Sequence, residues 1–433
     1  MSRTALRPWR PRAGEWDVAA AAHLLRRAGF GPAPGEAEEL AAGTVEDAIG
    51  AVLARDAHDE RLFRGVQALL GQESIERIAD WWMSLILAGG APLRERVTLM
   101  WHDHFATSDA KVGDARMMYT QNQLLREHGL GDFRVLLHRV ARDPAMLVWL
   151  DGNSNKAGQP NENFAREVME LFALGIGNYA ERDIKEAARA LTGWGTQGRA
   201  FRLREADHDD GEKVLFGERG RFRGEDALDR ILAHPACARH VARRLLVEFV
   251  APSPETAWID EAARTLVAHD WSIAATIEAI LRSELFFSPA ARRTRIASPV
   301  ELVAQALRRL GARLPAQRAA EAVGRMGQSL FRPPSVKGWD GMRAWINAGT
   351  WVARHNLLVR LAQAHRGDVD GVRVDLARAF SSAREVVAGL VPDLAGSELA
   401  RRVESAVADL EDEDERLATA TALVLTAPEY HLV

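Results

Sequence analysis

The sequence predicts a mainly α protein, a large multi-helix orthogonal bundle with one short β-hairpin near residues 200–223. Its 433 residues, 47% hydrophobic and 27% charged, are typical of a soluble globular chain that can bury a large core. Apolar residues recur at helical spacing along most of the sequence, and the pattern changes only between Gly195 and Gly224. There, FRLRE and KVLFG flank the polar turn ADHDDGE, which is a pattern typical of a hairpin.

The charge balance and the single cysteine exclude several classes of protein. A net charge of −4 gives no reason to expect nucleic-acid binding, and Cys237 alone can form neither an intrachain disulfide nor a cysteine-rich zinc site. The longest apolar stretch, near Trp81–Leu93, contains two glycines and is too short to span a membrane. The basic opening residues have no apolar run behind them, so we expect no signal peptide and a cytoplasmic protein, with export beside a partner left open.

The N-terminal part predicts an arm followed by helices. Residues 1–14 are rich in proline and arginine and are expected to be disordered. Glycine and proline signals bound the apolar runs that follow. These runs predict helices over Trp16–Ala28, two more between Thr44 and Gly71, one over Ile75–Ala88, one opened by Pro92, and others over Ala115–His128 and Asp132–Leu150.

Two histidines lie near the end of the helix that Pro92 opens. His104 falls on the apolar face formed by residues such as Met100 and Trp101, and we interpret it as a core imidazole with a buried polar partner. His102 is rotated away from it by about 160°, because residues two apart differ by about 200° at 3.6 residues per turn. The pair therefore cannot share a metal ion on a regular helix. His102 is the candidate catalytic acid or metal ligand.

The stretch Asp151–Trp194 concentrates amides, carboxylates and glycines more than any other part of the sequence. It predicts a polar loop, a helix over Asn161–Leu174, a glycine turn and a second helix. Asn163, a candidate substrate-binding amide, and the candidate catalytic residues Glu167 and Glu170 border the apolar face of the first helix. A half-buried polar site explains this arrangement, and so does a solvated face with an ion pair between Arg166 and Glu170.

The turn ADHDDGE adds further acid–base or ligand candidates, His208 and Asp209, although surface turns favour aspartate and glycine in any case. Only five of the 56 basic residues are lysines. Where arginine is the usual cation, a lysine indicates that a compact, strongly hydrated ammonium is needed. They are Lys111, Lys156, Lys185, Lys213 and Lys337, all in polar segments.

The C-terminal half predicts further helices and one unusual loop. The loop FRPPSVKGWDGMRAWINAG contains Lys337, a candidate catalytic cation, and the candidate substrate-binding residues Trp339, Asp340 and Trp345. Helices are expected over Glu225–Ala233, Pro235–Val250, Pro254–His269, Ile273–Ser283, Pro299–Leu310, Ala316–Leu330 and from the loop to Leu361. We expect a main helical domain over 15–365, a surface connection over 366–381, and C-terminal helices over 382–433 packed on that domain.

The polar loop of the central stretch also matches a calcium-binding pattern. Asp151, Asn153, Asn155 and Glu162 occupy positions 1, 3, 5 and 12 of the EF-hand loop, with helices expected on both sides. Lys156 stands where the pattern has glycine, and a left-handed backbone there would cost about 1 kcal/mol. The sequence is therefore compatible with weak calcium binding and, alternatively, with an amide-rich loop that caps the next helix.

Several segments together resemble the bacterial family catalogued as domain of unknown function 1800. The likeness covers nearly the whole chain and is carried by HLLRRAGFGP, WHDHFATSDAKV, LDGNSNKAGQPNENFAREVMELFALGIGNYAERDIKEAARALTGW, HDDGEKVLFG, MGQSLFRPPSVKGWDGMRAWINAGTWVARHN and APEY. The resemblance implies a mainly helical protein of no established activity. Members of the family often occur beside proteins that resemble the sulfatase and alkaline-phosphatase superfamily, and many carry export signals.

Two positions depart from the pattern of that family. Phe164 stands where the family usually has tyrosine, so no hydroxyl chemistry belongs to this position. Ala180 replaces a threonine that would cap the helix beginning at Glu181, a loss of about 1 kcal/mol. Neither change removes the acidic and amide groups.

A hydrolase-type enzyme is the first function that these residues suggest. Its polar site would combine the WHDHF, NENFARE, HDDGEK and PPSVKGWDG segments and could include a metal ion. Glu167 or Asp209 would act as the base, His102 or His208 as an acid or metal ligand, and Lys337 would stabilise the developing negative charge. No nucleophile elbow, phosphate loop, dinucleotide fingerprint or zinc-protease helix indicates a narrower class.

Two other functions compete with the enzyme. The chain could be a non-catalytic accessory protein that docks to a sulfatase-like neighbour through the loop Phe331–Trp345, since exposed tryptophan and arginine are interface anchors. The polar segments could also be purely structural and satisfy helix ends and buried amides. Exposure of Trp339 and Trp345 on a convex face would favour docking, whereas a cleft lined by both would favour an enzyme.

Overall fold

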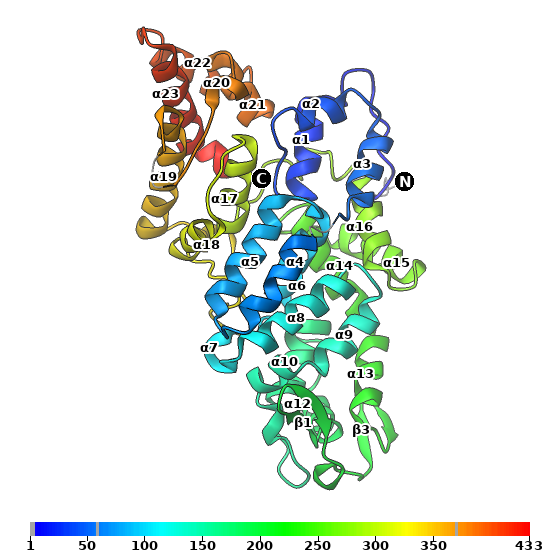
Figure 1. Ribbon diagram of the computed structural model, residues 1–433. Helices are drawn as coiled ribbons and strands as arrows, with labels where there is room; N and C mark the ends of the chain where they lie inside the picture. Colours follow the sequence, from blue (N-terminus) through cyan, green and yellow to red (C-terminus); the bar gives the residue numbers. More distant parts are fainter. Residues whose placement is uncertain (1–4, 58–59, 369–370) are drawn as a thin grey trace.

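A computed structural model describes residues 5–57, 60–368 and 371–433, and helices dominate these ranges (Figure 1). The first half contains α1 (Val18–Arg27), α2 (Glu36–Ala41), α3 (Val45–Ala54), α4 (Glu60–Leu70), α5 (Ile75–Ala88), α6 (Pro92–His104), α7 (Asp109–Val112), α8 (Ala115–His128), α9 (Phe133–Ala141), α10 (Pro144–Trp149), α11 (Asn163–Glu167) and α12 (Glu181–Ala190). The second half contains α13 (Gly224–Ala233), α14 (Pro235–Phe249), α15 (Thr256–Ala268), α16 (Ile273–Leu281), α17 (Pro299–Arg309), α18 (Ala316–Arg325), α19 (Ala348–Gln363), α20 (Leu376–Ala379), α21 (Ala383–Leu390), α22 (Glu398–Ala406) and α23 (Glu413–Thr426). The predicted mainly α fold is confirmed.

The buried apolar side chains of the described ranges form two hydrophobic cores. The first is built on α1–α3, α6 and α9–α16 and includes Trp101 and Phe249. The second is built on α4, α5 and α17–α23 and includes Trp82 and Tyr430. α8 contributes to both, with Leu125 in the first core and Met118 in the second. A division of this kind is expected, because single cores stop growing in chains of this length.

A buried group of charged side chains connects the two cores. Arg96 on α6 contacts Glu248 on α14 at 2.7 Å and Glu301 on α17 at 2.5 Å, and Arg295 pairs with both glutamates. We call this group the ionic seam. Burial works to raise the pKa of Glu301, but Arg295 and Arg96 outweigh it and hold that pKa below its usual range. The seam is therefore ionised at neutral pH.

The strands of the described ranges form two small antiparallel sheets rather than one hairpin. β1 (Trp194–Gln197) pairs with β2 (Ala200–Leu203), and β3 (Lys213–Leu215) pairs with β4 (Glu218–Gly220). FRLRE and KVLFG, which were expected to pair with each other, thus belong to different hairpins. The reason is that each has a tight turn of its own, with Gly198 and Gly217 at φ values of 58° and 83°. A short turn closes a hairpin at a lower entropic cost than the longer ADHDDGE loop would.

The expected N-terminal arm and the expected surface connection both make close contacts with the rest of the chain. In the expected disordered arm, Leu6 N donates to the Glu261 carboxylate and Trp9 stacks on Phe287 with the ring centroids 4.1 Å apart. Residues 1–4 of that arm lie outside the described residues. In the expected surface connection, Val372 and Leu376 are buried in the second core, and residues 369–370 lie outside the described residues. None of the helices in the described ranges combines the length and apolar character that crossing a bilayer requires.

Candidate functional site

A cavity of about 150 Å³ lies where α6, α14 and α17 meet the loop that follows α18. We call it the seam cavity because the ionic seam forms part of its wall. It brings the WHDHF and PPSVKGWDG segments together, as the sequence predicts. Its charged and aromatic lining consists of Arg96, Asp103, Arg244, Glu248, Arg295, Glu301, Trp339, Asp340 and Trp345.

Asp103, the central residue of WHDHF, faces this cavity from the last turn of α6. Its Oδ1 accepts a hydrogen bond from Trp339 N at 2.9 Å, and its Oδ2 accepts one from Arg244 Nη2 at 3.0 Å. The side chain keeps 26% of its exposure. Burial raises the pKa of Asp103 by more than Arg244 and the Trp339 N–H lower it. The cavity thus contains a carboxylate with increased proton affinity.

The loop can reach Asp103 because Gly338 has no side chain. Gly338 has a φ of 80°, which other residues rarely adopt, and a Cβ atom there would collide with the carboxylate and the backbone oxygen of Asp103. Any larger residue would push the loop away and break the hydrogen bond from Trp339 N. This glycine of the PPSVKGWDG segment therefore positions the loop over the end of α6.

Arg244 brings a cation from α14 to the same place. Besides Asp103, its Nη2 group donates to the backbone oxygen of Met100 in α6 at 3.0 Å. Its Nε atom is buried and has no hydrogen-bond partner. The side chain therefore fixes the end of α6 and still has a hydrogen-bond donor to spare.

His102 packs behind the loop and does not face the cavity as a free imidazole. It is 1% exposed, and its ring lies against those of Trp82, Phe331 and Trp339. Its Nε2 atom accepts a hydrogen bond from Phe331 N at 3.2 Å. Burial lowers the pKa of His102 to about 3, so the ring is neutral. The prediction that the His102 imidazole is accessible for catalysis or metal binding is therefore wrong, because the loop covers that side of α6.

Glu167 and Glu170 interact with each other, and Glu167 is also within electrostatic range of Lys337 in the loop. Burial raises the pKa of Glu167 and repulsion from Glu170 adds to this effect, whereas Arg166 and the exposed Lys337 oppose it. Glu170 accepts a hydrogen bond from the Tyr179 hydroxyl at 2.9 Å. The charge of Lys337 acts on Glu167, so the NENFARE segment lies within electrostatic range of the loop. WHDHF and PPSVKGWDG are the two predicted segments that line the cavity together.

The helix expected over 161–174 changes its winding after α11, in a π-helical turn at Val168–Ala173. The carbonyls of Leu171 and Phe172 accept hydrogen bonds from the Nε2 atoms of His240 and His104 at 2.8 and 2.9 Å. A carbonyl only accepts, so both imidazoles carry their proton on Nε2. π-helical turns are frequent near functional sites, and this one lies beside Glu167 and Glu170. The interpretation of His104 as a core imidazole agrees with this contact.

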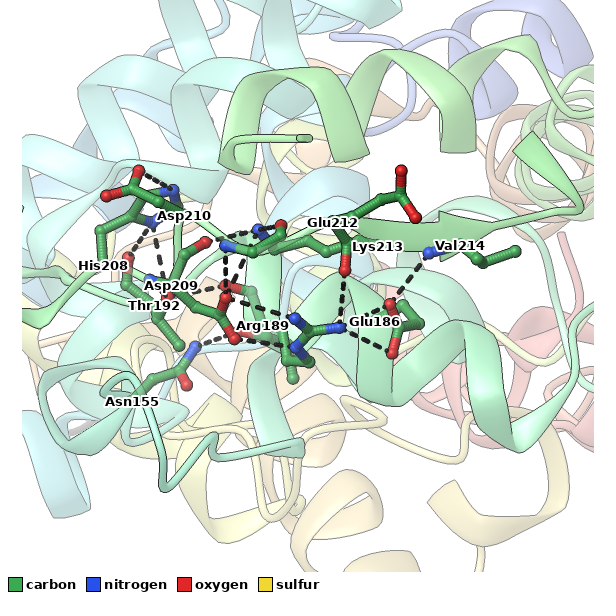
Figure 2. Close-up of polar contacts among 12 residues, drawn as sticks. Asn155, Glu186, Arg189, Thr192, His208, Asp209, Asp210, Glu212, Lys213 and Val214 are labelled. Atoms are coloured by element: carbon green, nitrogen blue, oxygen red, sulfur yellow. Dashed lines mark hydrogen bonds and ion pairs between the residues drawn. The ribbon is translucent and has the colours of Figure 1, made fainter. Parts of the chain in front are cut away.

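The HDDGEK turn makes its contacts elsewhere, with α12 and the loop before β1 (Figure 2). The Asp209 carboxylate pairs with Arg189 Nε at 2.8 Å, and His208 Nδ1 donates to the backbone oxygen of Thr192 at 3.0 Å. Lys213 is 1% exposed and donates to the backbone oxygens of Asp209 and Gly211. Within the described ranges, no hydrogen bond or ion pair joins this turn to the seam cavity. Figure 1 shows β1 and β3 at the end of the molecule away from α17.

The oxygens predicted to bind calcium each have a different hydrogen-bond or ion-pair partner, and bound calcium would have to replace these partners. The pairs are Asp151 Oδ1 with Lys111 Nζ (2.8 Å), Asn153 Oδ1 with Thr196 N (2.7 Å), Asn155 Oδ1 with Asn161 N (2.9 Å) and Glu162 Oε2 with Arg166 (3.1 Å). Asn163, predicted to bind substrate, donates to the backbone oxygen of Leu150 instead. Among the His, Cys, Asp and Glu side chains that the structure describes, no group of three or more is arranged to hold a metal ion.

Sequence reasoning missed six charged residues of the cavity, namely Arg96, Asp103, Arg244, Glu248, Arg295 and Glu301. Arg244, Glu248 and Arg295 give no local signal, because arginine is the common cation of this chain and a helical glutamate is usually solvated. Asp103 did carry a signal, since it lies between the two histidines at the end of α6. Neither histidine lines the cavity, whereas the Asp103 side chain between them does.

The fold and the site define a class of protein, a mainly α protein with two cores and a charged cavity between them. The chain belongs to the family described as protein of unknown function (DUF1800), whose model matches residues 23–432. The resemblance seen in the sequence segments is thereby confirmed. No curated protein matches the chain. No solved structure matches it either.

Proposed function

We propose that this protein is a hydrolase-type enzyme whose reaction takes place in the seam cavity, with Asp103 as the general base. The observation that carries the proposal is the position of Asp103. Its carboxylate, with a pKa raised by burial, faces a cavity that also contains Arg244 and two tryptophans. A base, a cation and an apolar wall, supplied by separate elements, are the parts that hydrolysis requires.

The proposed reaction is the hydrolysis of a small ester or amide. Asp103 takes a proton from a water molecule while the water oxygen forms a bond to the carbonyl carbon. A free N–H group of Arg244 stabilises the negative charge that develops on the carbonyl oxygen. When the bond to the leaving group breaks, the proton passes from Asp103 to that group, and the carboxylate is restored. A cavity of about 150 Å³ limits the substrate group to a small one.

The burial of the two tryptophans supports an enzyme rather than docking through this loop. Trp339 and Trp345 are 8% and 7% exposed and line the cavity, so they are not available as exposed interface anchors. Docking to a sulfatase-like neighbour would need another surface. Lys337 directly precedes Gly338, which lies against Asp103, and the charge of Lys337 acts on Glu167. We therefore assign Glu167 and Lys337 to substrate contacts outside the cavity.

The contacts of the HDDGEK turn support a structural role for that segment. His208, Asp209 and Lys213 bond to nearby backbone or to α12, and these bonds satisfy their polar groups locally. This part of the predicted site is therefore not included in the proposed mechanism.

Chromogenic p-nitrophenyl esters of short acids, together with the matching anilides, test the proposal. Asp103→Asn keeps the size of the side chain, and its amide oxygen can still accept from Trp339 N, but the substitution removes both the base and the negative charge that pairs with Arg244. We expect kcat/KM to fall by about 10²–10⁴-fold. Asp270→Asn is the matched control, because Asp270 is an exposed carboxylate that also pairs with an arginine, Arg134.

The result is interpreted only for variants that melt at the same temperature as the wild type. Equal hydrolysis by the wild type and by Asp103→Asn would refute the assignment of Asp103. No hydrolysis of any ester or anilide by the wild type would refute the proposed reaction.

A further inference from the structure

A second charged cluster lies between α1 and α17, and we propose that it binds a small oxyanion such as phosphate or sulfate. It consists of Arg26 on α1, Arg292 and Arg293 in the segment before α17, Arg309 on α17, and Asp393 after α21. We call it the arginine cluster. None of these residues lines the seam cavity, so the proposal is independent of the proposed function.

Asp393 is the carboxylate on which three of the arginines converge. Its Oδ2 atom lies 2.7 Å from Arg26 Nη2 and 3.9 Å from Arg293 Nη1, and its Oδ1 atom lies 3.5 Å from Arg292 Nη1. Burial works to raise the pKa of Asp393, but Arg26 and its neighbours outweigh it and lower that pKa. Asp393 is therefore ionised, and its one negative charge pairs with three guanidinium groups and attracts the guanidinium group of Arg309 as well.

The arginines keep buried donors that bond to nothing in the described part of the chain. Arg26 and Arg309 are 4% and 6% exposed. Arg26 Nε, Arg293 Nη1 and both Nε and Nη2 of Arg309 have no hydrogen-bond partner. Burial and the charge of Arg26 lower the pKa of Arg309 to about 10, so the guanidinium is still charged at neutral pH. Buried donors without acceptors are unfavourable, more so when they are charged.

The protein itself does not balance this charge. Glu38 attracts Arg309 and Glu429 attracts Arg293, but among the described residues neither carboxylate forms an ion pair with them. A tetrahedral oxyanion supplies both missing parts, since it carries negative charge and several acceptor atoms that suit the forked guanidinium. The side chain of Arg292 is 25% exposed, so the cluster has a solvent-accessible member on which an oxyanion would first bind.

Thermal unfolding in phosphate, sulfate, acetate and chloride at equal ionic strength tests the site, with titration calorimetry for the affinity. We expect a saturable rise of the wild-type melting temperature in phosphate or sulfate and one binding site. The acetate arm shows whether a carboxylate is enough. Arg309→Met removes two unpaired donors and should weaken binding about tenfold or more. Arg139→Met is the control, because Arg139 is an exposed arginine on α9.

Asp393→Asn sharpens the test because it removes the negative charge that competes with the ligand. This variant should be less stable than the wild type in chloride, should recover in phosphate, and should bind phosphate more tightly. Sulfate and phosphate also stabilise proteins generally, by exclusion from the surface. An equal rise in the wild type, Arg309→Met and Arg139→Met would therefore mean that there is no site and would overturn the proposal. If Arg309→Met does not fold, the more exposed Arg292→Met replaces it under the same criteria.

Discussion

Glu301→Gln is expected to destabilise the fold strongly, because Glu301 lies where the two hydrophobic cores meet. The carboxylate is 5% exposed, and its Oε1 atom faces both Arg96 and Arg295. Its Oε2 atom accepts a hydrogen bond from Ser298 N and completes the N-terminal cap of α17. Glutamine keeps the size of the side chain and an oxygen for that cap. With that oxygen on Ser298 N, the amide NH2 group faces the two arginines, so the substitution removes both the charge and the acceptor that they share.

The magnitude follows from the arginines that remain. Arg96 is 1% exposed and would lose one of its two carboxylate partners, and Arg295 would lose its closest one. Removing one partner of a buried ion pair costs about 3–5 kcal/mol, because a charge is left without compensation. That cost raises the unfolding equilibrium constant by a factor of about 10² to 10⁴. Glu404→Gln, which breaks an exposed pair with Arg384, should leave the stability unchanged within error.

The assay is urea unfolding of the wild type and both variants at pH 7 and at lower pH. Because the folded pKa of Glu301 is lowered, its stabilisation is present above the unfolded pKa, about 4.3, and is lost as the pH falls through the folded value. The difference between the wild type and Glu301→Gln should therefore narrow below about pH 4.3. A loss smaller than about 1 kcal/mol at pH 7 would refute the reasoning, since buried arginines would then need no carboxylate partner.

Three further predictions concern local groups. Ala180 is the N-cap of α12 but has no side-chain acceptor for the free N–H groups of the first turn. Ala180→Thr should therefore raise the free energy of unfolding, measured in thermal melts, by about 1 kcal/mol. Ala180→Val has a side chain of the same shape without the hydroxyl and should not raise it. His102 is neutral when folded but binds a proton below about pH 6.5 when unfolded. The stability advantage of the wild type over His102→Gln should therefore shrink by up to about 1.4 kcal/mol per pH unit from pH 6.5 towards 3, and a constant difference between pH 7 and 5 would contradict this. To bind at the EF-hand-like loop, calcium must displace Lys111 from Asp151, so titration calorimetry at millimolar calcium should show no heat of binding. A heat of binding that is lost in Asp151→Asn would instead confirm that this loop binds calcium.

The sequence by itself determined the fold class and the family. Helical spacing of apolar residues and the proline and glycine signals at helix ends are local properties, and they predict α5 and α14 closely without any tertiary contact. Local spacing also placed His104 on a core face. The hairpins were predicted in the right region, but their pairing was not, because the glycine turns inside each one decided it.

Only the tertiary structure decided which polar residues meet. Asp103 faces a cavity because Gly338 allows a loop from more than 200 positions further along the chain to contact it, and no local pattern reports that contact. The burial of Arg26, Arg96 and Arg309 depends likewise on how two cores pack together. Charged side chains carry no periodic signal of their own, and the sequence does not show which few of its many arginines the fold will bury. The ionic seam and the arginine cluster therefore appear only when the chain is folded.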